Sequence, residues 1–486
     1  MLSIIKNCLV LGCIVGLAGC GGHSDKLGLG SSKDEQLKTY AETFSPARDA
    51  LKAGQFDNLV NMINAGFTKD GEPLSDEEIK QELVDNNSEL SIVERGLLAL
   101  NSGAFERALV FFDAAEQKME KIESDQGVLA AGRSLGKKGF AAMIGMEESA
   151  EYEMRGYEKV MLLNYKALCY MLMGDRKAYN VTRKAIDRQQ EEWEKFKESL
   201  AELEEANAKS PAADIIEQIH IDNRSKDTKK KASLVSSAYV NPFGDYMNVV
   251  LQEIDSLSDP SLRDNARISY QKVVENNKGC TVAKVAAKEV MRKPSSKRKL
   301  VQVILADGFA PERKEMSESL SIAGYSAVVN FSEATPIPTK VSGARIKVGG
   351  QNSRLASLSR MESIILRDDQ DRMPWRYTMM GLALLRSGAA SAGAKQLGLD
   401  SMFGANLVSK LQRPDTRSWL SLPNQVLVAR MYVPNSAKDV KIETLSGGNV
   451  IASTSVPLAA EGPTLVYAVS YDNQLKAYAN KNSWIK

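Results

Sequence analysis

The sequence predicts an α+β protein whose N-terminal part is helical and whose C-terminal part is rich in strands. Over residues 34–291, apolar residues recur at spacings of three and four with few turn residues, a pattern typical of helices. After residue 300, short apolar runs alternate with Gly- and Pro-containing turns, which indicates strands. A chain of 486 residues has room for more than one domain with its own core.

Composition excludes several classes of protein. Hydrophobic residues make up 43% of the chain and aromatic residues 6%, as in globular proteins and unlike collagen or disordered chains. Lys and Arg total 63 against 61 Asp and Glu, so the basic excess of a dedicated nucleic-acid binder is missing and no nucleic-acid partner is expected. A His-based triad or metal centre would have to use His23 or His220, because the chain has two histidines.

The first residues have the features of a lipoprotein signal peptide. Lys6 precedes an apolar run over residues 8–17, which leads into the lipobox Leu17-Ala18-Gly19-Cys20. Small residues before the cysteine fit a signal peptidase in an extended conformation, and the Cys20 thiol takes the anchoring lipid. The alternative is an ordinary cysteine beside an ordinary cleavage site. We expect a signal peptide over residues 1–19 and lipidation of Cys20.

The residues after Cys20 predict the location of the mature chain. Gly21 stands where an Asp tends to retain a Gram-negative lipoprotein in the inner membrane, so the outer membrane is favoured. Residues 20–33 are rich in Gly and Ser and predict a flexible lipidated tether. No other segment approaches eighteen uncharged apolar residues, so the expected membrane contact is the N-terminal lipid, on the periplasmic side.

One unit of the helical part has the spacing of a tetratricopeptide repeat. Small residues would let paired helices approach, and phenylalanines would fill the space between them. The expected packing residues are Gly96, Gly103, Phe105, Ala108, Phe112 and Ala115. Weaker copies begin at Gly54 and Gly174, without a regular period, and generic amphipathic hairpins are the alternative. Both interpretations predict a solenoid-like or bundled helical domain over residues 34–291.

A long polar helix follows the third copy. Between Ile186 and Leu203 apolar residues alternate by three and four, as in the seam of a two-stranded coiled coil, and Pro211 ends the pattern. The isoleucines of residues 215–219 could lead back along this helix. The sequence therefore predicts a coiled-coil hairpin near residues 181–222.

The C-terminal part divides into two expected regions. Residues 300–425 form a mixed α/β region, with strands at 300–305, 327–331 and 344–348 and helices at 355–366 and 379–397. Residues 426–486 form an antiparallel β region or small sandwich, with strands at 426–433, 440–445, 450–456 and 465–470. The helix at 379–397 is rich in Gly, Ala and Ser, but Arg386 and Lys395 interrupt it, which favours close helix packing over a membrane hairpin.

Several short signatures lie between about residues 157 and 433. They are Gly156-Tyr157-Glu158-Lys159-Val160, residues 241–248, residues 264–270, Asp307-Gly308-Phe309-Ala310-Pro311, and Asp415-Thr416-Arg417-Ser418-Trp419 before Leu422-Pro423. In these the chain resembles an uncharacterised family of Gram-negative lipoproteins with tetratricopeptide-like helices, over more than half of the mature chain. The resemblance implies an accessory role in the cell envelope, as for activators of penicillin-binding proteins, and it implies no catalytic residues.

The sequence contains few motifs typical of catalytic, metal-binding or cofactor-binding sites. The glycines of residues 127–139 lack the Gly-Lys-Ser/Thr ending of a phosphate loop, and the aspartates of residues 368–371 lack the Gly and distal Glu of a calcium loop. A zinc-spaced Cys/His set does not occur in the sequence. We therefore expect no metal, no cofactor and no enzyme activity.

The expected function is that of a scaffold, in which a concave helical surface binds a protein partner in the envelope while lipid fixes its position. The alternative is a wall- or glycan-modifying enzyme with an acid pair such as Asp368 and Glu362.

In the oxidising periplasm Cys169 and Cys280 could be bridged, but their apolar and helix-end settings favour two free structural thiols.

Overall fold

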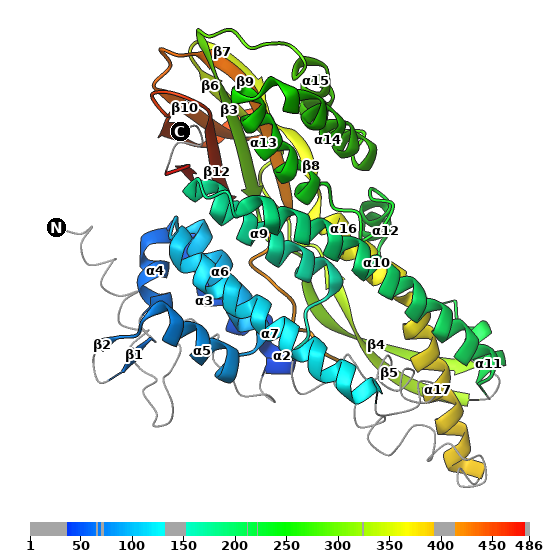
Figure 1. The fold of residues 1–486 in the computed structure, drawn as a ribbon. Helices are drawn as coiled ribbons and strands as arrows, with labels where there is room; N and C mark the ends of the chain where they lie inside the picture. Colours follow the sequence, from blue (N-terminus) through cyan, green and yellow to red (C-terminus); the bar gives the residue numbers. More distant parts are fainter. Residues whose placement is uncertain are drawn as a thin grey trace.

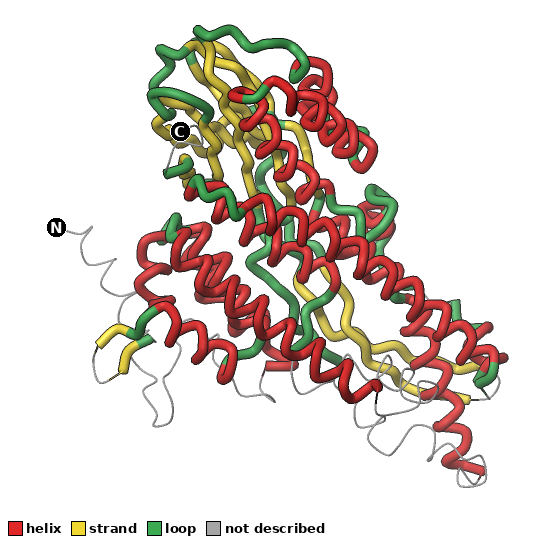
Figure 2. The backbone as a smooth tube through the Cα atoms, in the orientation of Figure 1, coloured by secondary structure: helices red, strands yellow, loops and turns green. Residues whose placement is uncertain are grey.

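The computed structural model describes residues 36–64, 67–69, 72–131, 152–210, 212–220, 222–322, 325–392 and 414–481. The protein is a mixed α+β structure, with most helices in the N-terminal part and most strands in the C-terminal part, as predicted (Figures 1 and 2).

Helices form one layer of the molecule. In the N-terminal part they are α2 (Gln36–Thr43), α3 (Ser45–Lys52), α4 (Phe56–Asn64), α5 (Asp76–Asn86), α6 (Glu89–Asn101), α7 (Phe105–Ala131), α9 (Gly156–Met173), α10 (Ala178–Ala208), α11 (Ala213–Glu217), α12 (Lys226–Ala232), α13 (Pro242–Ser258), η2 (Pro260–Leu262), α14 (Arg263–Asn276) and α15 (Thr281–Glu289). A small hairpin of β1 (Thr68–Lys69) and β2 (Glu72–Pro73) follows α4, and α16 (Met361–Asp371) and α17 (Met373–Ala392) lie later in the chain.

Three glycines mark the turns between consecutive helices. Gly54, Gly103 and Gly174 have φ angles of 73°, 82° and 72° and lie between α3 and α4, α6 and α7, and α9 and α10. A side chain is unfavourable in this left-handed region, so glycine ends each first helix and lets the chain turn into the next.

Two sheets pack face to face beneath the helices. The first has the order β13-β12-β3-β9-β8 and the second the order β11-β10-β6-β7. Their strands are β3 (Arg298–Asp307), β6 (Gly343–Val348), β7 (Gln351–Arg354), β8 (Ala356–Ser359), β9 (Gln425–Pro434), β10 (Asp439–Ser446), β11 (Asn449–Pro457), β12 (Thr464–Tyr471) and β13 (Gln474–Ala479). Within β3, Val301 and Val303 face the second sheet while Leu300 and Ile304 pack with the helices, because side chains alternate along a strand.

The predicted boundary at residue 426 does not separate two structural units. β3 lies between β9 and β12, pairing antiparallel with the first and parallel with the second, and β6 pairs with β10. Strands from 300–425 and 426–486 therefore share both sheets. Local sequence patterns predict individual strands, whereas both partners of β3 lie more than a hundred residues away along the chain.

Helices and sheet also share one apolar core. The largest buried cluster includes Tyr40 and Phe112 from helices and Ile304 from β3. Polar contacts cross the same boundary: Asn101 donates to the Tyr471 hydroxyl at 2.7 Å, and the Tyr467 hydroxyl donates to Asn101 Oδ1 at 2.7 Å.

A projecting arm is built from β4 (Glu312–Ile322), β5 (Tyr325–Thr335), α11 and α17 around a separate apolar cluster (Figure 1). Here the predicted coiled-coil hairpin near residues 181–222 is wrong, because α11 is one short helix packed on α17. A Cβ at Gly381 would lie 2.3 Å from Ile216 Cγ1, so the two helices are in close contact. The long helix α10 packs against α9 and α13 instead.

The structure also tests the predictions made for residues 355–366 and for the two cysteines. Residues 355–366, expected as one helix, contain strand β8 before α16 begins at Met361. Cys169 and Cys280 are both free and buried, as expected. Among the described helices, none combines the length and apolar character needed to span a bilayer.

Candidate functional site

Residues 414–424, called the buried segment below, run through the interior without regular secondary structure, and all but one of them are buried. Buried loops are unusual because their backbone polar groups lose water. Trp419 is 1% exposed, packs against Tyr165 with ring centroids 6.1 Å apart, and donates its indole N–H to Ser421 Oγ. The segment is therefore anchored by both apolar and polar contacts.

Two glutamates accept hydrogen bonds from the backbone of the buried segment. Glu158, in the first turn of α9, accepts from the Trp419 N–H at 2.9 Å. Glu94, in α6, accepts from the Leu420 N–H at 2.6 Å and from the Ser421 N–H at 3.1 Å. These carboxyl groups replace the water that an exposed loop would bind.

A third buried glutamate contacts the chain just before α9. Glu89 Oε2 accepts from the Met154 N–H at 2.9 Å, and its Oε1 has no hydrogen-bond partner within the described ranges. Glu158 also accepts from the Arg155 N–H at 2.9 Å and from the Tyr152 hydroxyl. Glu89, Glu94 and Glu158, the carboxylate set, therefore hold two separate segments against α6 and α9.

Burial changes the acidity of the carboxylate set. Loss of hydration raises the pKa of Glu89 and of Glu94 to about 8, and it raises the pKa of Glu158 as well. Hydrogen bonds from backbone amides lower these pKa values, but by less than burial raises them. The carboxylate set thus exchanges protons closer to neutral pH than ordinary glutamates do.

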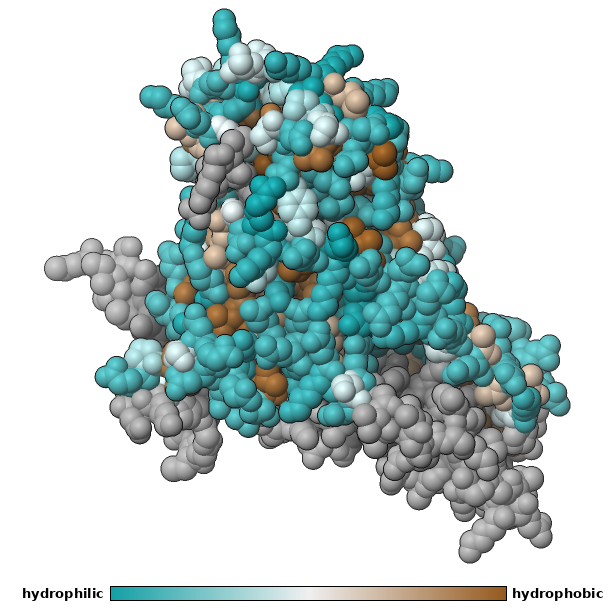
Figure 3. All heavy atoms as spheres, viewed as in Figure 1, coloured by the Kyte–Doolittle hydropathy of each residue, from teal (hydrophilic) through white to brown (hydrophobic). Residues whose placement is uncertain are grey.

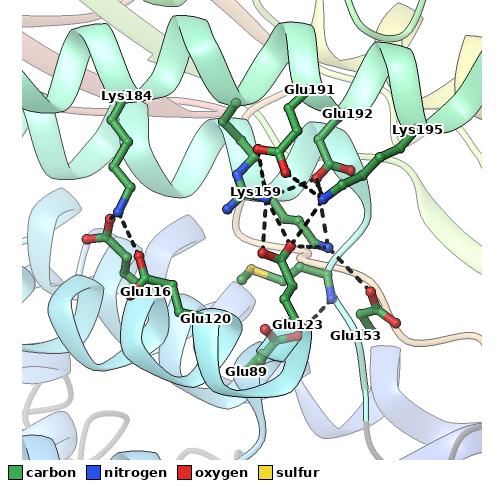
Figure 4. Close-up of polar contacts among 12 residues, drawn as sticks. Glu89, Glu116, Glu120, Glu123, Glu153, Lys159, Lys184, Glu191, Glu192 and Lys195 are labelled. Carbon is green, nitrogen blue, oxygen red and sulfur yellow. Dashed lines mark hydrogen bonds and ion pairs between the residues drawn. The ribbon is translucent and has the colours of Figure 1, made fainter. Parts of the chain in front are cut away.

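Beside the carboxylate set, ion pairs join α7, α9 and α10 (Figure 4). The Lys159 ammonium lies 2.9 Å from Glu123, 3.3 Å from Glu153 and 3.9 Å from Glu192. Burial disfavours the charge on Lys159, but these three carboxylates outweigh it and raise its pKa. Further along, Lys184 joins α10 to α7, 2.7 Å from Glu120. The arrangement fixes three helices rather than presenting a free amine.

The residues expected to pack in a repeat lie at the contact of α6 and α7. Their four side chains are buried, and a Cβ at Gly96 would lie 2.5 Å from the Phe112 ring. The buried side chains are those of Phe105, Ala108, Phe112 and Ala115. Gly103 forms the turn before them, next to the ring of Tyr478. Cys20 lies outside the described residues.

The acid pair named for an enzyme is engaged in ion pairs. Asp368 accepts from Arg155 at 2.8 Å and from Arg372 at 3.0 Å, while Glu362 lies 3.1 Å from Lys231. Burial opposes ionisation of Asp368, but the two arginines lower its pKa below the ordinary value. Asp368 is thus held as a carboxylate. In the described part of the chain, no group of three or more His, Cys, Asp or Glu residues is placed to hold a metal ion.

The role of the carboxylate set was not predicted from the sequence. The sequence does contain a pattern that points to Glu94. This residue stands four residues after Leu90 and four before Leu98, so it shares their helical face. A carboxyl group inside an apolar stripe indicates either a buried partner or a raised pKa.

Comparison with known proteins finds no matching family model, no matching curated protein and no matching solved structure.

Proposed function

We propose that the protein is an outer-membrane lipoprotein, anchored through Cys20 on the periplasmic side, that acts as a protein-binding scaffold of the cell envelope. The lipobox Leu17-Ala18-Gly19-Cys20 after an apolar run is the observation that carries this proposal. The resemblance to envelope lipoproteins with tetratricopeptide-like helices supports it. The helix-ending glycines and the packing of α6 on α7 are compatible with repeats of that kind.

In this proposal the partner protein binds the outer side of the helical layer. The inner side of α6 and α9 is covered by the buried segment and by the five-stranded sheet, so it does not offer the concave surface expected from the sequence. The outer side is mostly hydrophilic (Figure 3), and Lys184, Glu120 and Lys195 on it are about half exposed. Polar surfaces of this kind suit a reversible partner.

The anchor is tested by replacing Cys20 with Ala. The wild-type protein should incorporate labelled palmitate and sediment with outer membranes, and the variant should do neither. The conservative control is Cys13→Ala, which lies within the apolar run and should leave both results unchanged. Palmitate in the Cys20→Ala protein would contradict the anchor.

The scaffold is tested by affinity capture from crosslinked envelopes. One protein should co-purify in a fixed ratio. Reversing the charges of Arg183 and Lys197, which are exposed on α10 and make no ion pair to another helix within the described residues, should release it. Reversing Lys284 and Lys288, exposed on α15, is the matched control. Turnover of a wall glycan by the purified chain without any partner would instead support an enzyme.

A further inference from the structure

The outer face of the four-stranded sheet carries two rows of polar side chains that cross all four strands. In the first row the strand register places Arg354, Arg345, Glu443 and Ser453 opposite one another. In the second row it places Asn352, Lys347, Lys441 and Ser455 side by side. The alternate residues of β6, Ile346 and Val348, point into the core between the sheets, so both rows face outward.

Like charges stand directly opposite one another in both rows. Arg345 is paired with Arg354, and Lys347 is paired with Lys441. Such cross-strand pairs destabilise a sheet, since the side chains are close and repel each other. Glu443 lies near both lysines and offsets their repulsion, so the Arg345–Arg354 pair is the cost that remains.

A single carboxylate lies among these cations. Glu443 accepts from Arg345 Nε at 2.6 Å and from Lys347 Nζ at 2.9 Å, and Lys441 Nζ lies 3.3 Å away. Arg354 has no ion-pair partner in the ranges that the structure describes, and Asp439 lies at the far end of β10. Side chains of Arg345, Lys347 and Lys441 are 34%, 41% and 47% exposed, so the face is open to a ligand.

We propose that this cationic face binds an acidic polysaccharide, a hydroxyl-rich chain that carries carboxylates. Neighbouring strands lie roughly 4.8 Å apart, so the guanidinium groups of Arg345 and Arg354 reach one carboxylate together. Lys347 and Lys441 are placed in the same way for a second carboxylate. Binding relieves the repulsion between Arg345 and Arg354.

The neutral side chains of the face favour a hydroxyl-rich anion. Asn352, Ser453 and Ser455 offer hydrogen bonds to sugar hydroxyls. The Glu443 side chain is only 3% exposed and already accepts from Arg345 and Lys347. The two rows contain no aromatic side chain on which nucleic-acid bases could stack.

The test uses the full chain with Cys20→Ala, so that lipid at this position does not contribute, and polygalacturonate as the probe. Binding should weaken as salt is raised. The double variant Arg345→Gln/Arg354→Gln should bind at least about tenfold more weakly, because it loses charge-assisted hydrogen bonds. Lys284→Gln/Lys288→Gln, on α15, should bind like the parent.

Two further measurements distinguish weaker binding from unfolding, and an acidic polysaccharide from other ligands. Arg354→Gln alone should also bind polygalacturonate more weakly, and it should not lower the melting temperature, since it removes a repulsion. Weaker binding by this variant is then not caused by unfolding. Neutral dextran and vesicles containing phosphatidylglycerol are run in parallel. The proposal is overturned if polygalacturonate does not bind, if the double variant binds it equally well, or if only the vesicles bind.

Discussion

At the residue scale, Glu94 shows how burial changes the chemistry of one side chain. Its carboxyl group contacts the Tyr40 hydroxyl and the backbone amides of Leu420 and Ser421, with no cation bound to it among the described residues. Burial favours the protonated form and raises its pKa from 4.5 to about 8. Because the folded state holds this proton more tightly than the unfolded state, its contribution to stability is complete below pH 4.5 and is lost as pH rises through 8.

Glu94→Gln removes this titration, although its NH2 group cannot accept the backbone hydrogen bond that one carboxyl oxygen accepts in the wild type, so the variant loses that bond at every pH. We expect the free energy of unfolding of the wild type to fall more between pH 5 and pH 8 than that of the variant. The difference should be on the order of 1 kcal/mol or more, since one pKa unit corresponds to about 1.4 kcal/mol. Urea unfolding at both pH values measures it. Glu204→Gln, exposed on α10, should show no such change, and an unchanged pH dependence in Glu94→Gln would contradict the raised pKa.

A second prediction at this scale concerns Ala108, which is fully buried where α7 packs on α6. Ala108→Phe adds a ring where no space exists, and overpacking costs roughly 1–3 kcal/mol. We expect a lower melting temperature. Ala201→Phe on the exposed side of α10 is the control and should melt like the wild type. Equal melting of both variants would show that the α6–α7 contact is not tight.

At the element scale, the apolar helix α17 packs on α11 and β5 within the arm. Gly381→Ala should push α17 away from Ile216, since the added Cβ would lie 2.3 Å from its Cγ1. We expect a loss of about 1–3 kcal/mol in thermal or urea unfolding. Gly343→Ala is a matched control, because a Cβ there has no neighbour within 4 Å. If the two variants unfold alike, α17 does not pack this closely.

At the scale of the whole molecule, helices and sheet depend on one another. Arg430 of β9 binds Glu253 of α13 with its Nη2 2.5 Å from Oε1, and both side chains are almost fully buried. The apolar core also continues across this boundary. Removing one partner of a buried ion pair leaves an unpaired charge and destabilises strongly.

We therefore expect the described body to unfold in one cooperative step. The calorimetric and van't Hoff enthalpies should agree, and Arg430→Gln should lower the single melting temperature for helical and strand signals together. The rim variant Lys284→Gln should leave it unchanged. Two separate transitions, with helices lost before strands, would contradict a shared core.

Much of the secondary structure could be predicted from sequence. The helices around Phe105 and Phe112 and the strands at 300–305 and 426–433 follow from periodicity within about ten residues, and Gly103 marks its turn by the φ angle that only glycine adopts easily. Such signals are local, because they depend on which residues share one face of one element.

The lipobox before Cys20 is likewise determined by the sequence alone, as a hypothesis about location. Only the tertiary structure decided the strand order, the burial of residues 414–424 and the pairing of Arg345 with Arg354. Each of these brings together segments whose sequence patterns are independent. Glu94 and Ser421 meet across more than three hundred residues, and the burial that raises the pKa of Glu94 exists only once the packed core has removed water from both.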